Sequence, residues 1–184
     1  MVPSTAPALE TLFGPAEIAA AVRRVADALV ADLAGARVVY VPVMTGSLYF
    51  AVDLLRALDG RLGIERIAAA VVSSYGTGTS AERRPRVDAF PSPEALAGRV
   101  ALVVDTIVDS GATAEVALAE ARARGATEAR LACLLDKPAG RRCKVTPDWA
   151  GLVAPDRFLV GYGLDAGGLH RTLPCVSAFA ERPR

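Results

Sequence analysis

The stretch "VVDTIVDSGAT" (residues 103–113) decides the fold of this 184-residue chain. An apolar run ends at two acids four positions apart, Asp105 and Asp109, and then passes through Ser-Gly-Ala-Thr into a helical pattern. This order predicts a buried strand that turns directly into a helix. Because glycine lets the backbone approach a ligand closely and a helix N-terminus attracts anions, the turn at 110–113 is typical of a phosphate-binding loop.

The two carboxylates narrow the range of ligands for such a loop. They repel a bare phosphate dianion, whereas a ribose phosphate offers hydroxyl groups to accept and can bring a magnesium ion. The alternative is that Asp109 only caps the following helix. The presence of a second acid, Asp105, and of Gly111 in the same stretch favours a ligand site over a helix cap. The sequence contains neither the GxxxxGK[ST] pattern of a P-loop nor a GxGxxG that follows a strand.

Predicted strands and helices alternate through the first 136 residues. Helices are predicted over 15–34, 48–59 and 112–124, and strands over 37–44, 64–76, 99–104 and 129–136. Because the strands are continuously apolar, they predict a parallel sheet that helices cover on both faces. Ligands of such α/β folds bind beyond the carboxyl ends of the strands. Three unusual stretches fall at those ends: "MTGS" (44–47), "DTIVDSGAT" (105–113) and "LLDKP" (134–138).

The remaining segments do not follow the alternation of strand and helix. Residues 1–13 are expected to form a loose arm, in which Leu9, Leu12 and Phe13 could dock, and the polar, proline-rich residues 76–93 a mobile lid. The glycine- and proline-rich tail from 137 to 184 is expected to form a small hood subdomain over the sheet edge. The chain is thus one domain with a core of about 15–136. In the basic cluster at 137–144 only Lys137 is expected to have a role beyond a solvated loop.

Composition excludes several classes of protein. With 21 basic and 20 acidic residues, the chain has no excess charge for a nucleic-acid partner. The 3 cysteines are widely spaced without a CxxC pair, which indicates reduced thiols in a cytoplasmic protein. No charged leader precedes an apolar stretch, and no apolar run reaches the roughly 18 residues of a membrane span. We therefore expect neither a nucleic-acid nor a membrane partner.

Five patches in the expected order give the chain a family resemblance. It resembles the type I phosphoribosyltransferases, and within that group the hypoxanthine-guanine phosphoribosyltransferases. The resemblance implies the fold of that family and transfer of the 5-phosphoribosyl group of phosphoribosyl pyrophosphate (PRPP) to hypoxanthine or guanine. It also implies IMP or GMP and pyrophosphate as products, a Mg²⁺ cofactor and a homodimer or homotetramer, for which helix 48–59 is a plausible interface. The patches are 41–58, "SSYG" (73–76), "VVDTIVDSGAT" (103–113), "LLDKP" (134–138) and "PDRFLVGYGLD" with "HRTLP" (155–165, 170–174).

The resemblance implies a role for each matching residue. Asp109 is implied to be the catalytic proton acceptor or donor at N7 of the purine. Asp105 is implied to face the ribose hydroxyls, with Thr106 beside it, and to bind magnesium together with Asp165. The other implied PRPP contacts are to the 5′-phosphate through Ser110, Gly111, Ala112 and Thr113, and to pyrophosphate through Thr45, Gly46 and Arg171. Ser74 and Tyr75 are implied to begin the lid that closes over the reacting centre. The implied purine contacts are Lys137 on the 6-oxo group, Phe158 stacked on the base, the Leu159 backbone beside it and Asp165 near the 2-position.

Three positions depart from the family pattern. The family usually has two adjacent acids where this chain has Asp105 and Thr106, a lysine at Thr45 and a larger, often basic residue at Ala112. Each change removes electrostatic support from the PRPP half of the site and leaves the base half intact. The alternative to an enzyme is therefore a weakly catalytic or non-catalytic regulator that binds PRPP or a nucleotide on the same fold. A relative that uses another acceptor base is a third possibility.

Overall fold

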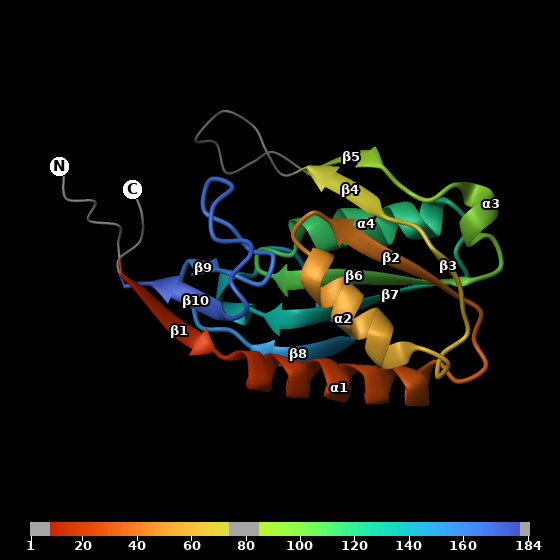
Figure 1. The fold of residues 1–184 in the computed structure, drawn as a ribbon. Coiled ribbons are helices and arrows are strands. Elements are labelled where there is room, and N and C mark those ends of the chain that lie inside the picture. The colour runs from red at the N-terminus through yellow and green to blue at the C-terminus, as the bar shows by residue number, and fades with distance from the viewer. Residues whose placement is uncertain (1–7, 74–84, 181–184) are drawn as a thin grey trace.

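The computed structural model describes residues 8–73 and 85–180, which build a twisted sheet with helices on both faces (Figure 1). The strand order is β5-β4-β2-β6-β7-β8, with β3 also paired to β2. All neighbours run parallel except β4 and β5. This arrangement confirms the predicted α/β fold class. The strands are β2 (Val38–Met44), β3 (Ile64–Ile67), β4 (Ala70–Ser73), β5 (Arg86–Ala89), β6 (Val100–Val108), β7 (Glu128–Asp136) and β8 (Trp149–Val153).

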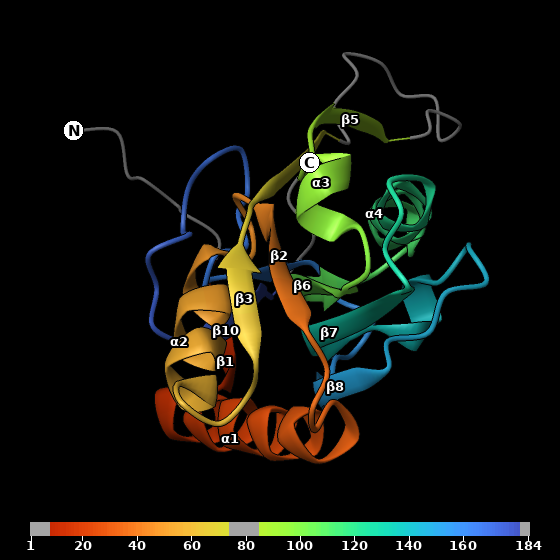
Figure 2. The same ribbon diagram turned by 90° about the vertical axis from the view of Figure 1, so that its right-hand side faces the viewer.

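Helices lie on both faces of this sheet (Figure 2). α1 (Pro15–Asp32) and α2 (Leu48–Leu58) cover one face, and α4 (Ala112–Ala123) with the short α3 (Pro93–Leu96) covers the other. Since successive side chains of a strand point to opposite faces, β6 contributes Leu102 to the first core cluster and Val103 to the second. No helix in the described part of the chain is long and apolar enough to cross a membrane.

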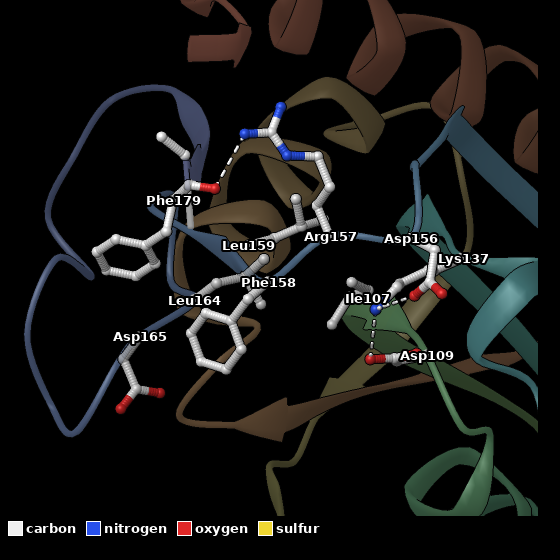
Figure 3. Close-up of a pocket in the computed structure, with 11 residues that line it drawn as sticks. Ile107, Asp109, Lys137, Asp156, Arg157, Phe158, Leu159, Leu164, Asp165 and Phe179 are labelled. Carbon is white, nitrogen blue, oxygen red and sulfur yellow. Dashed lines mark hydrogen bonds and ion pairs between the residues drawn. The ribbon is translucent and has the colours of Figure 1, made fainter. Parts of the chain in front are cut away.

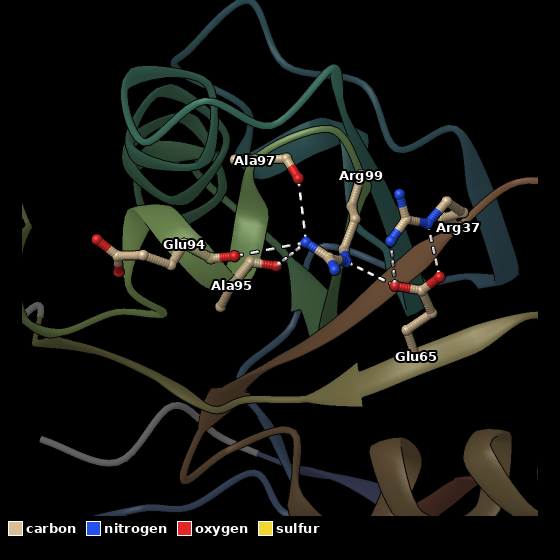
Figure 4. A network of polar contacts seen from close by, with 6 residues as sticks. All are labelled: Arg37, Glu65, Glu94, Ala95, Ala97 and Arg99. Atoms are coloured by element: carbon tan, nitrogen blue, oxygen red, sulfur yellow. Dashed lines mark hydrogen bonds and ion pairs between the residues drawn. The ribbon is translucent and has the colours of Figure 1, made fainter.

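An ion-pair network joins the strands at their amino ends (Figure 4). The Glu65 carboxylate of β3 accepts hydrogen bonds from Nε of Arg37 at 2.6 Å and from Nε of Arg99 at 2.7 Å. These two arginines lower the pKa of Glu65 to about 2. Arg99 also donates to the Ala97 carbonyl at 3.0 Å, just after α3. Because Arg37 and Arg99 directly precede β2 and β6, the network fixes the amino ends of three strands. These ends lie opposite residues 105–113, which we call the acid-and-glycine loop.

A small antiparallel sheet forms the hood. Its order is β1-β10-β9, made of β1 (Leu9–Phe13), β10 (Val176–Phe179) and β9 (Leu159–Val160). The expectation of a loose arm was therefore wrong for residues 9–13. The partner of β1 lies at the other end of the chain, with Leu9 opposite Phe179, so local sequence patterning carries no sign of the pairing.

The predicted strand 64–76 and the predicted lid 76–93 both differ in the structure. β3 pairs with Val38–Tyr40 of β2, whereas β4 pairs further along at Val43 and Met44. The break between them is bridged by the Ala68 amide, which donates to the Tyr40 carbonyl at 3.0 Å. Within the predicted lid, residues 86–89 form β5, and α3 begins at its last residue, Pro93. Residues 76–84 of that lid lie outside the described residues.

Residues 149–153, which were expected in the hood, extend the main sheet as β8. They run parallel to β7, with Ala132 opposite Trp149. The Trp149 side chain is buried and donates from Nε1 to Asp32 of α1 at 2.8 Å. The hood is therefore smaller than predicted and consists of β1, β9, β10 and the loop between the last two.

Candidate active site

Two adjoining cavities, of about 500 and 480 Å³, open at the carboxyl ends of the strands. The base-side cavity is lined by residues from Lys137, the 156–159 segment and the end of β10, and the phosphate-side cavity by residues from the 44–46 turn, β4 and the 108–114 loop. The structure thus brings the three unusual stretches of the sequence together under the hood. Both cavities share the residues Ile107, Asp109, Leu164 and Asp165.

The acid-and-glycine loop turns from β6 into α4 at Gly111. Gly111 has φ +86°, a left-handed conformation that a residue with a Cβ rarely adopts. A Cβ there would also lie 3.0 Å from Cδ of Arg141. Ser110, Gly111 and Thr113 line the phosphate-side cavity at the N-terminus of α4, where backbone N–H groups and the helix dipole favour an anion.

Lys137 lies between two carboxylates on the base side (Figure 3). Its Nζ is 3.2 Å from Oδ2 of Asp109 and 3.2 Å from Oδ1 of Asp156. The lysine side chain is 10% exposed, whereas those of Asp109 and Asp156 are 49% and 67% exposed. A buried ammonium thus faces the cavity with its charge balanced by acids that water can reach. Sequence reasoning missed Asp156, although it lies in the same "PDRF" patch as Phe158.

Aromatic and aliphatic side chains line the rest of the base-side cavity. Phe158 is half-exposed, and its ring centroid lies 6.0 Å from that of Phe179. Leu159, Ile107 and Leu164 add aliphatic surface. A flat apolar ligand with one polar edge toward Lys137 matches this lining. Phe179, which belongs to the C-terminal strand β10, was not predicted from the sequence.

The phosphate-side cavity carries more acid than base. Among the described residues that line it, Arg171 is the one basic residue, against Asp105, Asp109 and Asp165. Burial raises the pKa of Asp105 to about 7, although the backbone N–H of Thr106 donates to its carboxylate at 2.7 Å. Thr45 and Gly46 line the cavity as predicted.

Arg171 is held within the hood loop. Its Nη2 lies 2.7 Å from Oδ1 of Asp165, and its Nη1 donates to the Gly163 carbonyl at 2.7 Å. Asp165 also accepts from the Gly168 amide at 2.6 Å. Both predicted residues reach the cavity, but in this structure they bind each other.

Several predicted PRPP contacts are placed elsewhere. Thr106, expected to face the ribose, is fully buried and lines neither cavity. Its Oγ1 donates to the Gly46 carbonyl at 2.9 Å, so the side chain is directed at the 44–47 turn. Ala112 also lines neither cavity. Ser74 and Tyr75 lie outside the described residues.

Arg141 fastens the acid-and-glycine loop and corrects the expectation of a solvated basic cluster. Its Nε donates to the Asp109 carbonyl at 2.9 Å and its Nη2 to the Val108 carbonyl at 3.0 Å. It also contacts the Asp136 carboxylate and the Val145 carbonyl. Because most of these acceptors are backbone carbonyls of neighbouring loops, no sequence pattern distinguishes Arg141 from its solvated neighbours.

The donor set fits a magnesium ion that is shared with a substrate. Residues 8–73 and 85–180 contain no group of three or more His, Cys, Asp or Glu side chains that could hold a metal on their own. Magnesium is commonly bound by one or two carboxylates together with substrate phosphates. Asp105 suits this role because its carboxylate lines the cavity and its pKa is raised by burial, which a cation reverses. Asp165 suits it only after exchanging its ion pair with Arg171.

Comparisons with known proteins agree with this geometry. Residues 11–166 match the family model described as the phosphoribosyl transferase domain. The chain is 36% identical over 136 residues to the hypoxanthine-guanine phosphoribosyltransferase of Bacillus subtilis (strain 168), covering 73% of this chain and 72% of that protein. It is 34% identical over 169 residues to the bifunctional protein TilS/HprT of Listeria innocua, covering 91% of this chain but only 25% of that protein.

A solved structure shares the fold. The hypoxanthine phosphoribosyltransferase from Staphylococcus aureus superposes with a TM-score of 0.82 at 28% sequence identity, over 92% of this chain and 90% of that one.

Proposed function

Because the chain belongs to the phosphoribosyl transferase family, and within it to the hypoxanthine-guanine phosphoribosyltransferases, we propose that it transfers the phosphoribosyl group of PRPP to an oxopurine. Hypoxanthine gives IMP and guanine gives GMP, with pyrophosphate as the leaving group. The observation that best supports this proposal is that the base-side and phosphate-side cavities meet at Asp109. A bond between a base and a ribose phosphate forms where two such compartments join.

On the base side, the residues suit an oxopurine better than adenine. Lys137 donates to the 6-oxo group, and Phe158 stacks on the ring. Leu159 and Asp165 lie toward the 2-position. Asp109 accepts or donates the proton at N7 as the bond at N9 forms. This carboxylate is accessible from both cavities, which general acid-base help requires.

On the phosphate side, the acid-and-glycine loop and the hood contact different parts of PRPP. The N-terminus of α4, at Ser110–Thr113, holds the 5′-phosphate, and Asp105 accepts from the ribose hydroxyls. Thr45, Gly46 and Arg171 face the pyrophosphate. Asp105, together with substrate oxygens, would hold magnesium, which when bound would supply the positive charge that neutralises the leaving group. C1′ passes through an oxocarbenium-like state, as in glycoside cleavage, so exclusion of water by the hood prevents hydrolysis.

Steady-state assays with Mg·PRPP and a panel of bases test this proposal. Nucleotide and pyrophosphate are measured with hypoxanthine, guanine, xanthine and adenine. We expect turnover with oxopurines and a kcat/KM for adenine lower by roughly one to two decades, because the 6-amino group of adenine cannot accept the hydrogen bond that Lys137 donates to a 6-oxo group. A regulator is the alternative that Thr45 and Thr106 favour, and calorimetric PRPP binding without nucleotide formation would identify it. If the protein neither binds PRPP nor forms nucleotide, both the enzyme and the regulator are refuted.

We also propose self-association through α2. Its outer face exposes Leu48, Tyr49 and Val52, which are 44%, 36% and 39% exposed. Light scattering coupled to size exclusion measures the mass, and Val52→Glu is the variant that should lower it. An unchanged mass in that variant, or a monomeric unmutated protein, removes this assignment.

A further inference from the structure

Thr106 connects two walls of the phosphate-side cavity from behind. We propose that Thr106 is a positioning residue that fixes the 44–47 turn against Asp105 and so shapes the pyrophosphate end of the site. The inference rests on the proposed function for its kinetic consequences, and on the contacts of Thr106 for its geometry.

Thr106 makes one hydrogen bond to each wall. Its backbone N–H donates to Oδ1 of Asp105 at 2.7 Å, which orients the carboxylate that faces the ribose. Its Oγ1 donates to the Gly46 carbonyl at 2.9 Å, in the turn that carries Thr45. Thr106 is fully buried, so water cannot replace either partner. Beyond the pairing of β2 with β6, Thr106 therefore links the Asp105 carboxylate to the turn through one residue.

The hood rests on the same carbonyl. Gly163 has φ +99°, and a Cβ at that position would collide with the Gly46 carbonyl oxygen and lie 3.7 Å from Oγ1 of Thr106. The Gly163 backbone is in turn bound to Arg171, by its N–H to the Arg171 carbonyl at 2.9 Å and by its carbonyl to Nη1 of Arg171 at 2.7 Å. β6, the 44–47 turn and the Arg171 loop thus meet around Gly46.

The chemistry of this junction requires a hydrogen-bond donor at position 106. The Gly46 carbonyl oxygen is an acceptor, and an ionised carboxylate has no proton to donate. An acid at 106 would place a buried charge against that oxygen. Thr106 therefore replaces the second acid of the family pattern with a neutral hydroxyl that donates to the Gly46 carbonyl. It follows that Thr106→Asp weakens PRPP binding, although it restores the pattern of the family.

Two substitutions separate the hydroxyl from the shape of the side chain. Thr106→Val keeps the branched shape and removes the donor, whereas Thr106→Ser keeps the donor. Thr11→Val, on the exposed face of β1, is the matched control. KM for PRPP, KM for the base, kcat and the thermal midpoint are measured for each, with Mg·pyrophosphate affinity from calorimetry. Backbone amide NMR shifts of Gly46 and Gly163 report the turn directly and do not depend on activity.

We expect Thr106→Val to raise KM for PRPP and the Kd for Mg·pyrophosphate by roughly two- to tenfold, the range for loss of one neutral hydrogen bond. The KM for the base should stay within twofold, Thr106→Ser and Thr11→Val should match the unmutated protein, and the Gly46 amide should shift only in the valine variant at position 106.

Two results would overturn the positioning role. One is an unchanged KM, Kd and Gly46 amide shift in Thr106→Val. The other is a lower thermal midpoint with equal changes for both substrates, which marks a purely structural residue. If the unmutated protein shows no transferase activity, the proposed function fails, and the amide shifts with the pyrophosphate affinity still decide the role of Thr106.

Discussion

Replacing Lys137 by methionine removes one charge from the base-side cavity and leaves the volume of the side chain nearly unchanged. The ammonium makes two ion pairs at 3.2 Å, but Asp109 and Asp156 are 49% and 67% exposed and can be hydrated when it is lost. Pairs of such exposure contribute about 0–1 kcal/mol, so we expect a small change in the free energy of unfolding. A hydrogen bond from a charged donor to the substrate is worth roughly 1.5–3 kcal/mol, which is about one to two decades in kcat/KM.

The assay is steady-state kinetics with hypoxanthine and PRPP varied in turn, together with thermal unfolding. We expect kcat/KM for hypoxanthine to fall by roughly 10- to 100-fold in Lys137→Met, with KM for PRPP nearly constant. Lys144→Met, in an exposed part of the same loop, is the matched control and should behave as the unmutated protein. A fall of less than about twofold, or equal use of adenine and hypoxanthine by the unmutated protein, refutes the assignment of Lys137 to the 6-oxo group.

Three further predictions concern other parts of the molecule. Asp109→Asn should lower kcat by about 10²- to 10⁴-fold with little change in the thermal midpoint; a large drop in the midpoint with normal specific activity would instead indicate a helix cap. Arg141→Met removes the donor to the Asp109 carbonyl, so it should cost roughly 1–3 kcal/mol of stability and weaken PRPP binding, while Arg142→Met should do neither. The pKa of Glu65 is lowered from 4.5 to about 2, so its ion pairs stabilise the fold above pH 4.5 and are lost as the pH falls toward 2; acid titration of unfolding should show a smaller loss across this window in Glu65→Gln.

The central strands could be predicted because they are buried on both faces. β2, β6 and β7 are continuous apolar runs, and that pattern arises from a sheet covered on both sides. The edge strands β1 and β5 could not, since each is short, partly polar and defined by pairing with a distant segment. Propensity within a window of residues contains no information on such partners.

The same contrast holds within the candidate site. Asp105, Asp109 and Lys137 follow apolar strands directly, so their place at the sheet edge follows from the sequence. The direction of Thr106 was not available from the sequence, because its hydroxyl donates to a backbone carbonyl of a turn 60 residues earlier in the chain. Arg141 was out of reach, because its role depends on carbonyl groups that every residue carries.

The pairing of β1 with β10 has a consequence for synthesis of the protein. The wall of the base-side cavity includes Phe179, in the strand that pairs with Leu9–Phe13. A nascent chain can therefore assemble β2, β6, β7 and the acid-and-glycine loop by contacts of shorter sequence separation before its C-terminal strand leaves the ribosome. The phosphate-side cavity forms first on this route, and the base-side cavity is closed only when β1 and β10 pair.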